Sequence, residues 1–268
     1  MTFAFLVAAC GAEESAAPSD TTAQDSSAED TSEIGGQELA ATAPEPTFFF
    51  DTLPPGSVLP DGETCAERVR ADTSIEVRPE NEGPNRTTVD VTVERIDGAD
   101  DVWNEAFAPR ISGDFTGTTE ELLRWASCKW GFNEDTTRAR AVTESTWFAA
   151  TEGDGTEDAE ACAILDLEAP CFQSYGLLQV KGTIHLGTYP YAGESSAFGI
   201  DYAMAWLRAC YEGSFTWLND YAPGIPYEAG NEFGCVGAWF SGEWWDQPAN
   251  DYVGTVRYHI NNRTWEQY

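Results

Sequence analysis

The chain has few basic residues for its length. Among 268 residues, Lys and Arg number 14 against 46 Asp and Glu, which gives a formal net charge of -32. Binding to nucleic acid needs a basic surface that displaces counterions from phosphates, so this balance excludes nucleic-acid partners and polybasic membrane-surface modules. Such an acidic, Lys-poor surface suits salty surroundings, because it keeps a protein soluble when screening is strong.

Long apolar runs and metal-binding spacings are also missing. The sequence has no apolar stretch of about 18 residues or more, so it predicts no membrane-spanning helix. Its two histidines, His185 and His259, stand in no ligand spacing, and no C-x-x-C is present, which argues against a zinc site. A glycine-rich phosphate loop and a G-x-S-x-G elbow are absent as well. We therefore expect no metal and no cofactor.

The N-terminus has features of an export signal. Residues 1–9 are mostly apolar and end in small residues before Cys10, which resembles the lipobox of bacterial lipoproteins, where the Cys is lipidated. The usual basic start is missing, and the apolar run is short. Residues 11–46 have no aromatic and no basic residue, a composition that predicts a disordered acidic linker. We expect Cys10 to anchor the protein at the outer face of the cell membrane or cell wall.

The other six cysteines agree with export. An even number of cysteines suits disulfides in an oxidising compartment, although sequence alone does not fix their connectivity. One candidate pair closes a short loop, and another would pin the N-terminal segment to the rest of the domain. We expect the pairs Cys162–Cys171, Cys210–Cys235 and Cys65–Cys128.

The folded part divides into two predicted regions. Residues 47–115 form a small extended region, in which 87–96 alternates with Val89, Val91 and Val93 on one face and predicts a half-buried strand. Residues 116–268 have helical patterns. Helices are expected from Thr118 with a capping box to Glu121, from Asp135 to Ser145, over 200–211 and over 251–261. The predicted fold class is α+β, a mainly helical domain with a small β-containing N-terminal extension and disulfides.

Two short motifs stand in the helical region. The second predicted helix ends in Glu144-Ser145, and the run Gly-Leu-Leu-Gln-Val follows at 176–180. In this order and spacing they resemble the lysozyme-like lytic transglycosylases, the superfamily of the soluble lytic transglycosylases and goose-type lysozyme. In that family a helix ends in a catalytic Glu followed by Ser, and a Gly-Leu-Met-Gln-like turn on a short hairpin faces it. The resemblance covers residues 116–268 and implies a lysozyme-like domain.

The resemblance implies cleavage of the MurNAc–GlcNAc glycosidic bond of peptidoglycan strands. Glu144 would first protonate the leaving oxygen and then act as a base, while the 6-hydroxyl of the sugar attacks to give a 1,6-anhydro product. A carboxylic acid can do this near neutral pH if a partly apolar pocket raises its pKa. The protein would act as a monomer. Carried over to this chain, the substrate-binding residues are Ser145, Tyr175, Gly176, Leu177, Gln179 and Trp239.

Parts of the chain depart from the family pattern. The family's Ala-Tyr-Asn-Ala-Gly-like motif is represented by 238–242, in which Phe240 replaces the Asn. Residues 148–173 form a long acidic insertion with two Cys.

These departures leave two other functions open. A hydrolytic muramidase would use Asp154 or Asp158 as a second carboxylate, roughly 5 to 9.5 Å from Glu144. A non-catalytic wall-binding module would leave Glu144 exposed, or paired with an Arg that keeps it ionised.

Overall fold

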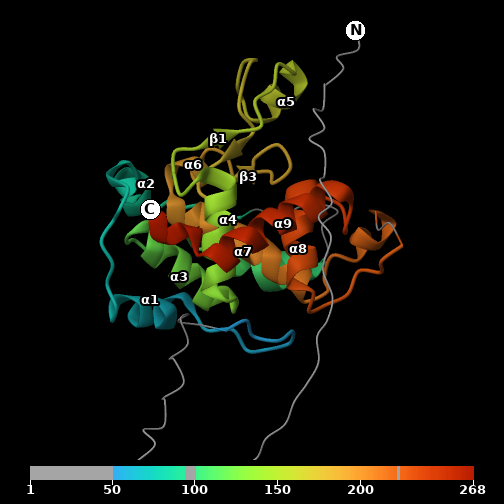
Figure 1. Ribbon diagram of the computed structural model, residues 1–268. Coiled ribbons are helices and arrows are strands. Elements are labelled where there is room, and N and C mark those ends of the chain that lie inside the picture. Colours follow the sequence, from blue (N-terminus) through green and yellow to red (C-terminus); the bar gives the residue numbers. More distant parts are fainter. Residues whose placement is uncertain (1–50, 94–100, 222–223) are drawn as a thin grey trace, which may run out of the picture. The chain divides into compact units, whose positions relative to one another are not determined.

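A computed structural model describes residues 51–93, 101–221 and 224–268 (Figure 1). The expected lipobox at 1–10 and the linker at 11–46 lie outside these ranges. All described residues belong to one compact unit, so residues 51–115 pack together with the helical region that follows them. Within the described ranges, no helix is long and apolar enough to cross a membrane.

The described chain is mainly helical and has one small sheet, which agrees with the expected fold class at this level. Strands β1 (Glu152–Gly153), β2 (Ser174–Tyr175) and β3 (Val180–Lys181) pair antiparallel in the order β1-β2-β3. Short 3-10 or π turns cover Pro79–Asn81, Trp103–Phe107, Ala108–Arg110, Thr216–Tyr221 and Thr264–Gln267. The α-helices are α1 (Gly62–Arg70), α2 (Glu82–Arg86), α3 (Thr119–Trp130), α4 (Glu134–Ser145), α5 (Ala159–Ile164), α6 (Tyr191–Glu194), α7 (Ser196–Tyr211), α8 (Glu232–Ser241) and α9 (Gln247–Asn262).

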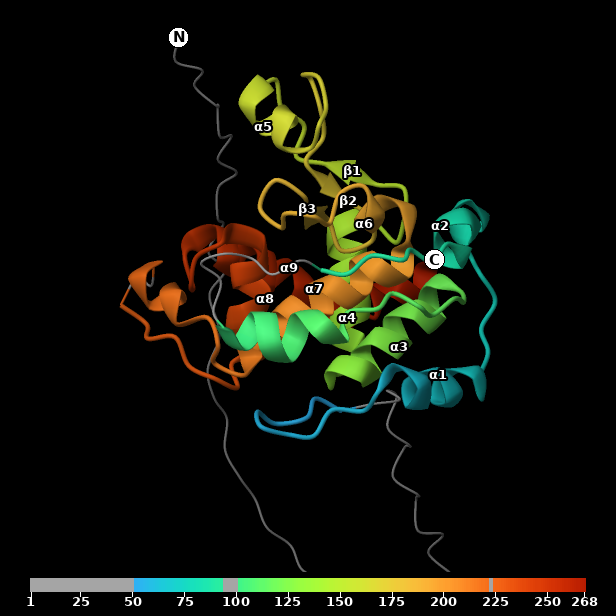
Figure 2. The ribbon, with the colours of Figure 1, turned by 180° about the vertical axis from the view of Figure 1, so that it is seen from behind.

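The core is built around α7, whose residues are all buried. Helices α3 and α8 pack on α7, while α9 packs on both α4 and α8. Figure 2 shows α7 between these helices from the side opposite to Figure 1, and in both views α5 lies beyond the sheet at the end of the acidic insertion. Helix α4, which carries Glu144, therefore packs on α3 and α9, while strand β3 of the hairpin packs on α7.

The expected β-containing extension is wrong. Residues 51–93 and 101–115 contain helices and no strand, and the sheet lies within the insertion and the hairpin instead. Val89, Val91 and Val93 are half-buried against the core and alternate with exposed residues, but no strand pairs with them. Alternation reports which face of an extended segment is buried, whereas a strand also needs a hydrogen-bonded partner.

The helix beginnings follow local capping chemistry. The capping box of Thr118 and Glu121 is present at α3, and Gly131 ends that helix in the left-handed conformation. Helix α4 is capped by Asn133, whose side chain accepts from the backbone N–H of Asp135, so Asp135 is not the cap that the sequence predicted. Asn and Asp are comparable N-caps, and here Asn133 takes the position, so α4 begins at Glu134.

The two later helices start earlier than expected. Ser195 caps α7 and Asp246 caps α9, each by accepting a hydrogen bond from a backbone N–H in the first turn. In α9 the residues that define the apolar periodicity, Tyr252 and Val253, lie after the first turn, so a boundary based on that periodicity falls several residues too late. In α7 the buried Ala197 and Phe198 already lie in the first turn, so the expected start at 200 misses the beginning of the pattern.

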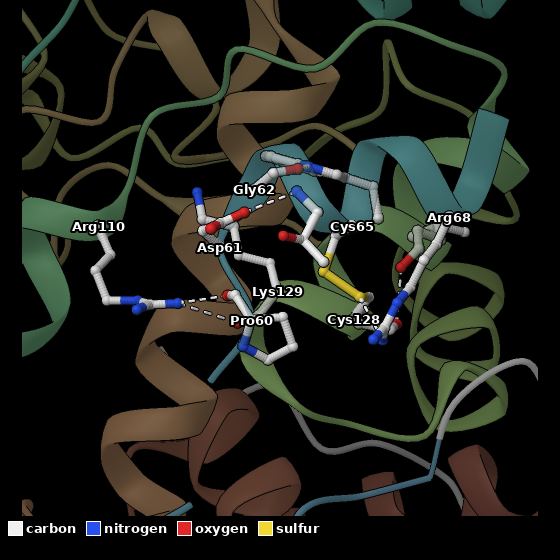
Figure 3. Close-up of a disulfide and its surroundings, with 12 residues drawn as sticks. Pro60, Asp61, Gly62, Cys65, Arg68, Arg110, Cys128 and Lys129 are labelled. Atoms are coloured by element: carbon white, nitrogen blue, oxygen red, sulfur yellow. Dashed lines mark hydrogen bonds between the residues drawn. A yellow bond between two sulfur atoms is a disulfide. The ribbon is translucent and has the colours of Figure 1, made fainter. Parts of the chain in front are cut away.

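All three expected disulfides are confirmed. Cys65–Cys128 joins α1 to α3, and Figure 3 shows Arg110 beside it, donating to the carbonyl oxygens of Pro60 (2.9 Å) and Lys129 (3.4 Å). Cys210–Cys235 joins α7 to α8, and Cys162–Cys171 joins α5 to the segment just before β2. Cross-links of this kind restrict the unfolded chain and so stabilise the fold.

Candidate active site

The end of α4 contacts the turn of the β2–β3 hairpin. Glu144 lies in the last turn of α4, and the helix stops at Thr146, which adopts a left-handed conformation with φ 53°. The hydroxyl of Ser145 donates to the carbonyl oxygens of Ala141 (2.9 Å) and Leu177 (3.1 Å). The two sequence motifs are therefore in contact, and the hydrogen bond from Ser145 to Leu177 joins them.

The turn itself depends on one glycine and one amide. Gly176 has φ +80°, and a Cβ there would lie 2.5 Å from the carbonyl oxygen of Ala192, so a larger residue does not fit. Gln179 has φ 49°, and its side-chain amide donates to the carbonyl oxygens of Thr151 (3.0 Å) and Gly176 (2.8 Å). Gln179 thus closes the turn and ties it to the segment after α4.

Glu144 is half-buried, and its carboxyl interacts with two aromatic side chains, Tyr252 and Trp239. The phenol of Tyr252 on α9 donates to its Oε1 at 2.5 Å. Burial raises the pKa of Glu144 to about 7; the negative charge of Asp154 adds to the rise, while Tyr252, Arg140 and Trp239 oppose it. Near neutral pH the carboxyl is therefore populated in both its protonated and its ionised forms, as an acid/base catalyst requires.

Aromatic rings line the side of the site formed by α8. Trp239 stacks on His185, with ring centroids 4.9 Å apart and planes at 12°, and burial lowers the pKa of His185 to about 4, so that imidazole is neutral. Phe240 is 54% exposed and stacks on Tyr252 at 4.7 Å with planes at 5°. The outer face of Phe240 is thus an exposed aromatic surface next to the ring that holds Glu144.

A second carboxylate, Asp154, lies just after β1. Ser174 donates to its Oδ2 at 2.7 Å, and Lys181 pairs with the same oxygen at 3.1 Å. Partial burial raises the pKa of Asp154, but these two partners outweigh that effect and lower the pKa below its usual value. Asp154 is therefore ionised when Glu144 titrates. Asp158, the other candidate, is exposed and caps α5.

The structure divides the expected substrate-binding residues into two groups. Trp239 lies at Glu144, as expected. The hydroxyl of Tyr175 instead donates to the carbonyl oxygen of Phe172 at 2.6 Å, and its ring packs on Tyr189 beside a separate hollow of about 240 Å³. Most members of the second group are buried, and all of them shape the helix end and the hairpin: Ser145, Tyr175, Gly176, Leu177 and Gln179.

Two residues of the site were not predicted from the sequence. Tyr252 comes from α9 and is 108 positions away from Glu144 along the chain. Arg140 lies one turn before Glu144 on α4, and that helical spacing is the signal that could have identified it. Over the described residues, no cluster of three or more His, Cys, Asp or Glu is arranged to hold a metal ion.

The raised pKa of Glu144 predicts a pH-dependent stability difference. A carboxyl whose pKa is raised by folding stabilises the fold below its unfolded pKa, and that contribution is lost as the pH rises through about 7. We expect Glu144→Gln to unfold with the same free energy as the wild type at pH 4 and to be more stable by about 1–3 kcal/mol at pH 8. Denaturant unfolding of both proteins at pH 4 and pH 8 measures these free energies. The prediction would be contradicted if the variant and the wild type differed by the same free energy at both pH values.

The site combines a carboxyl that titrates near neutral pH, an ionised second carboxylate and exposed aromatic surface. Such a set can transfer protons next to a bound sugar, because flat rings stack on the apolar faces of sugars. In comparisons with known proteins, no family model, no curated protein and no solved structure matches this chain.

Proposed function

We propose that the described domain has a lysozyme-like fold and cleaves the glycosidic bond between MurNAc and GlcNAc in peptidoglycan strands, as a lytic transglycosylase. The observation that carries the proposal is Glu144 itself. It lies in the last turn of a helix beside a glycine-containing hairpin turn, has a pKa of about 7, and accepts a hydrogen bond from Tyr252. The resemblance of 144–145 and 176–180 to that family gives independent support.

The proposed reaction needs one carboxyl. Protonated Glu144 gives its proton to the glycosidic oxygen, the bond from that oxygen to the anomeric carbon breaks, and the N-acetyl group of the sugar stabilises the positive charge at that carbon. The carboxylate then takes the proton of the 6-hydroxyl, whose oxygen bonds to the anomeric carbon and forms the 1,6-anhydro ring. Since Tyr252 occupies Oε1, Oε2 is the oxygen that carries the proton in this scheme.

A non-catalytic binding module is less well supported. That function would leave Glu144 exposed or paired with an Arg. Among the described residues, Glu144 forms no ion pair within 4.0 Å, and it is half-buried. A carboxyl with a raised pKa lowers the free energy of unfolding at neutral pH, and a surface that only binds the wall gains nothing from this loss of stability.

Hydrolysis is the second candidate, because Asp154 is ionised and raises the pKa of Glu144. We expect Asp154→Asn to keep more than about a third of the wild-type cleavage rate, since Glu144 acts alone in the proposed reaction. The pH above which the rate falls should move down, because a negative charge near Glu144 is removed. Asp158→Asn is the matched control. A loss beyond about a hundredfold in Asp154→Asn alone would contradict a reaction carried by Glu144 alone and favour hydrolysis with Asp154 as the second carboxylate.

The three disulfides indicate an oxidising compartment outside the cytoplasm. We further propose that Cys10 carries a lipid, and that the linker at 11–46 holds the domain against the wall while the anchor stays in the membrane. Mass analysis of the mature N-terminus after membrane extraction tests the anchor. An unmodified Cys10 in the membrane fraction would contradict it.

The function is tested by incubating the disulfide-bonded protein with insoluble, dye-labelled peptidoglycan. We expect the release of soluble labelled fragments in proportion to enzyme and time. The free energy of unfolding of the same preparation shows that it is folded. If the folded protein binds the wall and releases nothing, the proposed cleavage is wrong.

A further inference from the structure

Arg140 differs from the other buried cations of the described chain. Its side chain is fully buried, and it forms no ion pair within 4.0 Å. Its Nε and Nη2 atoms have no hydrogen-bond partner, although the chain buries them completely. Every other buried Lys or Arg among the described residues is paired with a carboxylate: Arg124, Lys129, Arg138 and Arg208.

A buried guanidinium that pairs with no carboxylate destabilises a fold, because the ion loses its hydration without gaining a counter-charge in contact. Buried polar groups left unsatisfied in this way call for an explanation other than packing. An apolar side chain of similar length would fill the same space at lower free energy. The buried charge of Arg140 therefore indicates a role toward a neighbouring group with which it interacts electrostatically.

The surroundings of Arg140 point to Glu144. Its guanidinium carbon lies 5.5 Å from the ring centroid of Trp239, and its Nη1 donates to the Sδ of Met204 at 3.3 Å. Glu144 follows four positions later on the same helix, so both side chains leave α4 on one face. Trp239, which lies over the guanidinium, also interacts with the carboxyl of Glu144.

We propose that Arg140 is an electrostatic positioning residue for Glu144: its fixed charge stabilises the carboxylate that forms when Glu144 gives up its proton, and it holds Trp239 beside that carboxylate. The inference rests on the proposed function only in that the proton goes to a glycosidic oxygen. Arg140 is buried beneath the site and does not touch substrate.

The other groups around Glu144 do not supply this positive charge. Asp154, after β1, is negative and raises the pKa of Glu144, and Tyr252 on α9 is a neutral donor. His185, behind Trp239, is neutral because burial lowers its pKa to about 4. Glu232 on α8 also faces Arg140, and burial raises the pKa of Glu232 while Arg140 lowers it. Arg140 alone opposes burial with a full positive charge.

The test is Arg140→Met in the full chain, beside Arg138→Met as the matched control. Met is an unbranched, uncharged side chain that can replace the contacts of Arg140 with Trp239 and Met204, so we expect the Arg140 variant to unfold at equal or higher temperature than the wild type. Arg138 lies on the same helix but pairs with Glu120 and Asp135, so Arg138→Met should lower the unfolding temperature.

The pKa of Glu144 is measured in each variant by carbon-detected NMR titration of its carboxyl. We expect Arg140→Met to raise this pKa by more than about half a unit, Arg140→Lys to restore most of the wild-type value, and Arg138→Met to leave it unchanged. With substrate, Arg140→Met should lower kcat by about tenfold with little change in KM, because Arg140 does not contact the sugar.

Two results would overturn the inference. One is an unchanged pKa of Glu144 in folded Arg140→Met, and the other is a loss of stability in Arg140→Met equal to that in Arg138→Met. Both readouts come from the free protein. The pKa and the stability can be measured even if the protein cleaves no glycan. Failure of the proposed function and failure of this inference are therefore distinguishable.

Discussion

Replacing Glu144 by Gln is expected to lower the rate of peptidoglycan cleavage by about a thousandfold or more. Gln keeps the size of the side chain and can still accept the hydrogen bond from Tyr252, but it has no proton to give to the glycosidic oxygen. General acid and base steps by one group each contribute roughly a hundred- to ten-thousandfold, and Glu144 supplies both in the proposed reaction. The initial rate of fragment release measures the effect.

The matched control for this substitution is Glu152→Gln. Glu152 lies on β1 and is exposed, so its loss of charge should leave the rate within about twofold of the wild type. Both variants should bind insoluble peptidoglycan as the wild type does. If Glu144→Gln retained more than about a tenth of the rate, Glu144 would not be the acid, whatever the other variants did.

The largest effect on stability is expected at Asp201, which is fully buried on α7. It accepts from Lys129 Nζ (2.6 Å), Trp130 Nε1 (2.6 Å) and the backbone N–H groups of Ser112 (2.9 Å) and Gly113 (3.1 Å). Asp201→Asn leaves the buried Lys129 cation without its counter-charge. We expect a loss of about 3–5 kcal/mol in the free energy of unfolding, measured with denaturant.

A surface carboxylate provides the comparison for Asp201. Asp114 accepts from the hydroxyl of Ser112 at 2.7 Å but is exposed, so Asp114→Asn should change the free energy of unfolding by less than about 0.5 kcal/mol. Adding Lys129→Met to Asp201→Asn should recover part of the loss, because the unpaired cation is then removed. A loss below about 1 kcal/mol in Asp201→Asn would show that this buried cluster does not hold α3 to α7.

The elements that the sequence predicted well are those that local chemistry specifies. The capping box of Thr118 and Glu121 fixes the start of α3 within one turn. The contact between Ser145 and the turn at Leu177 joins segments 32 positions apart, and only the resemblance of the two motifs to the lytic transglycosylases implied it. Among the disulfides, only Cys162–Cys171 has a local signal, because it closes a short loop, whereas sequence alone did not fix the other two pairs.

The unpredicted parts depend on contacts between distant segments. Tyr252 reaches Glu144 only because α9 packs on α4, and nothing near Tyr252 in the sequence distinguishes it from a buried core tyrosine. The alternation at Val89, Val91 and Val93 was read as a strand, although burial on one side of an extended segment produces the same pattern. Arg140 looked like an ordinary helix residue, since its lack of a partner is a property of the packed core.

The most direct test of the central claim is mass spectrometry of the fragments released from peptidoglycan by the wild type and by Glu144→Gln. We predict fragments ending in 1,6-anhydro sugars from the wild type and none from the variant. Fragments with ordinary reducing ends would contradict the transglycosylase reaction and show hydrolysis, for which Asp154 is the candidate second carboxylate. Anhydro fragments produced equally by both proteins would contradict the assignment of Glu144 as the acid and base.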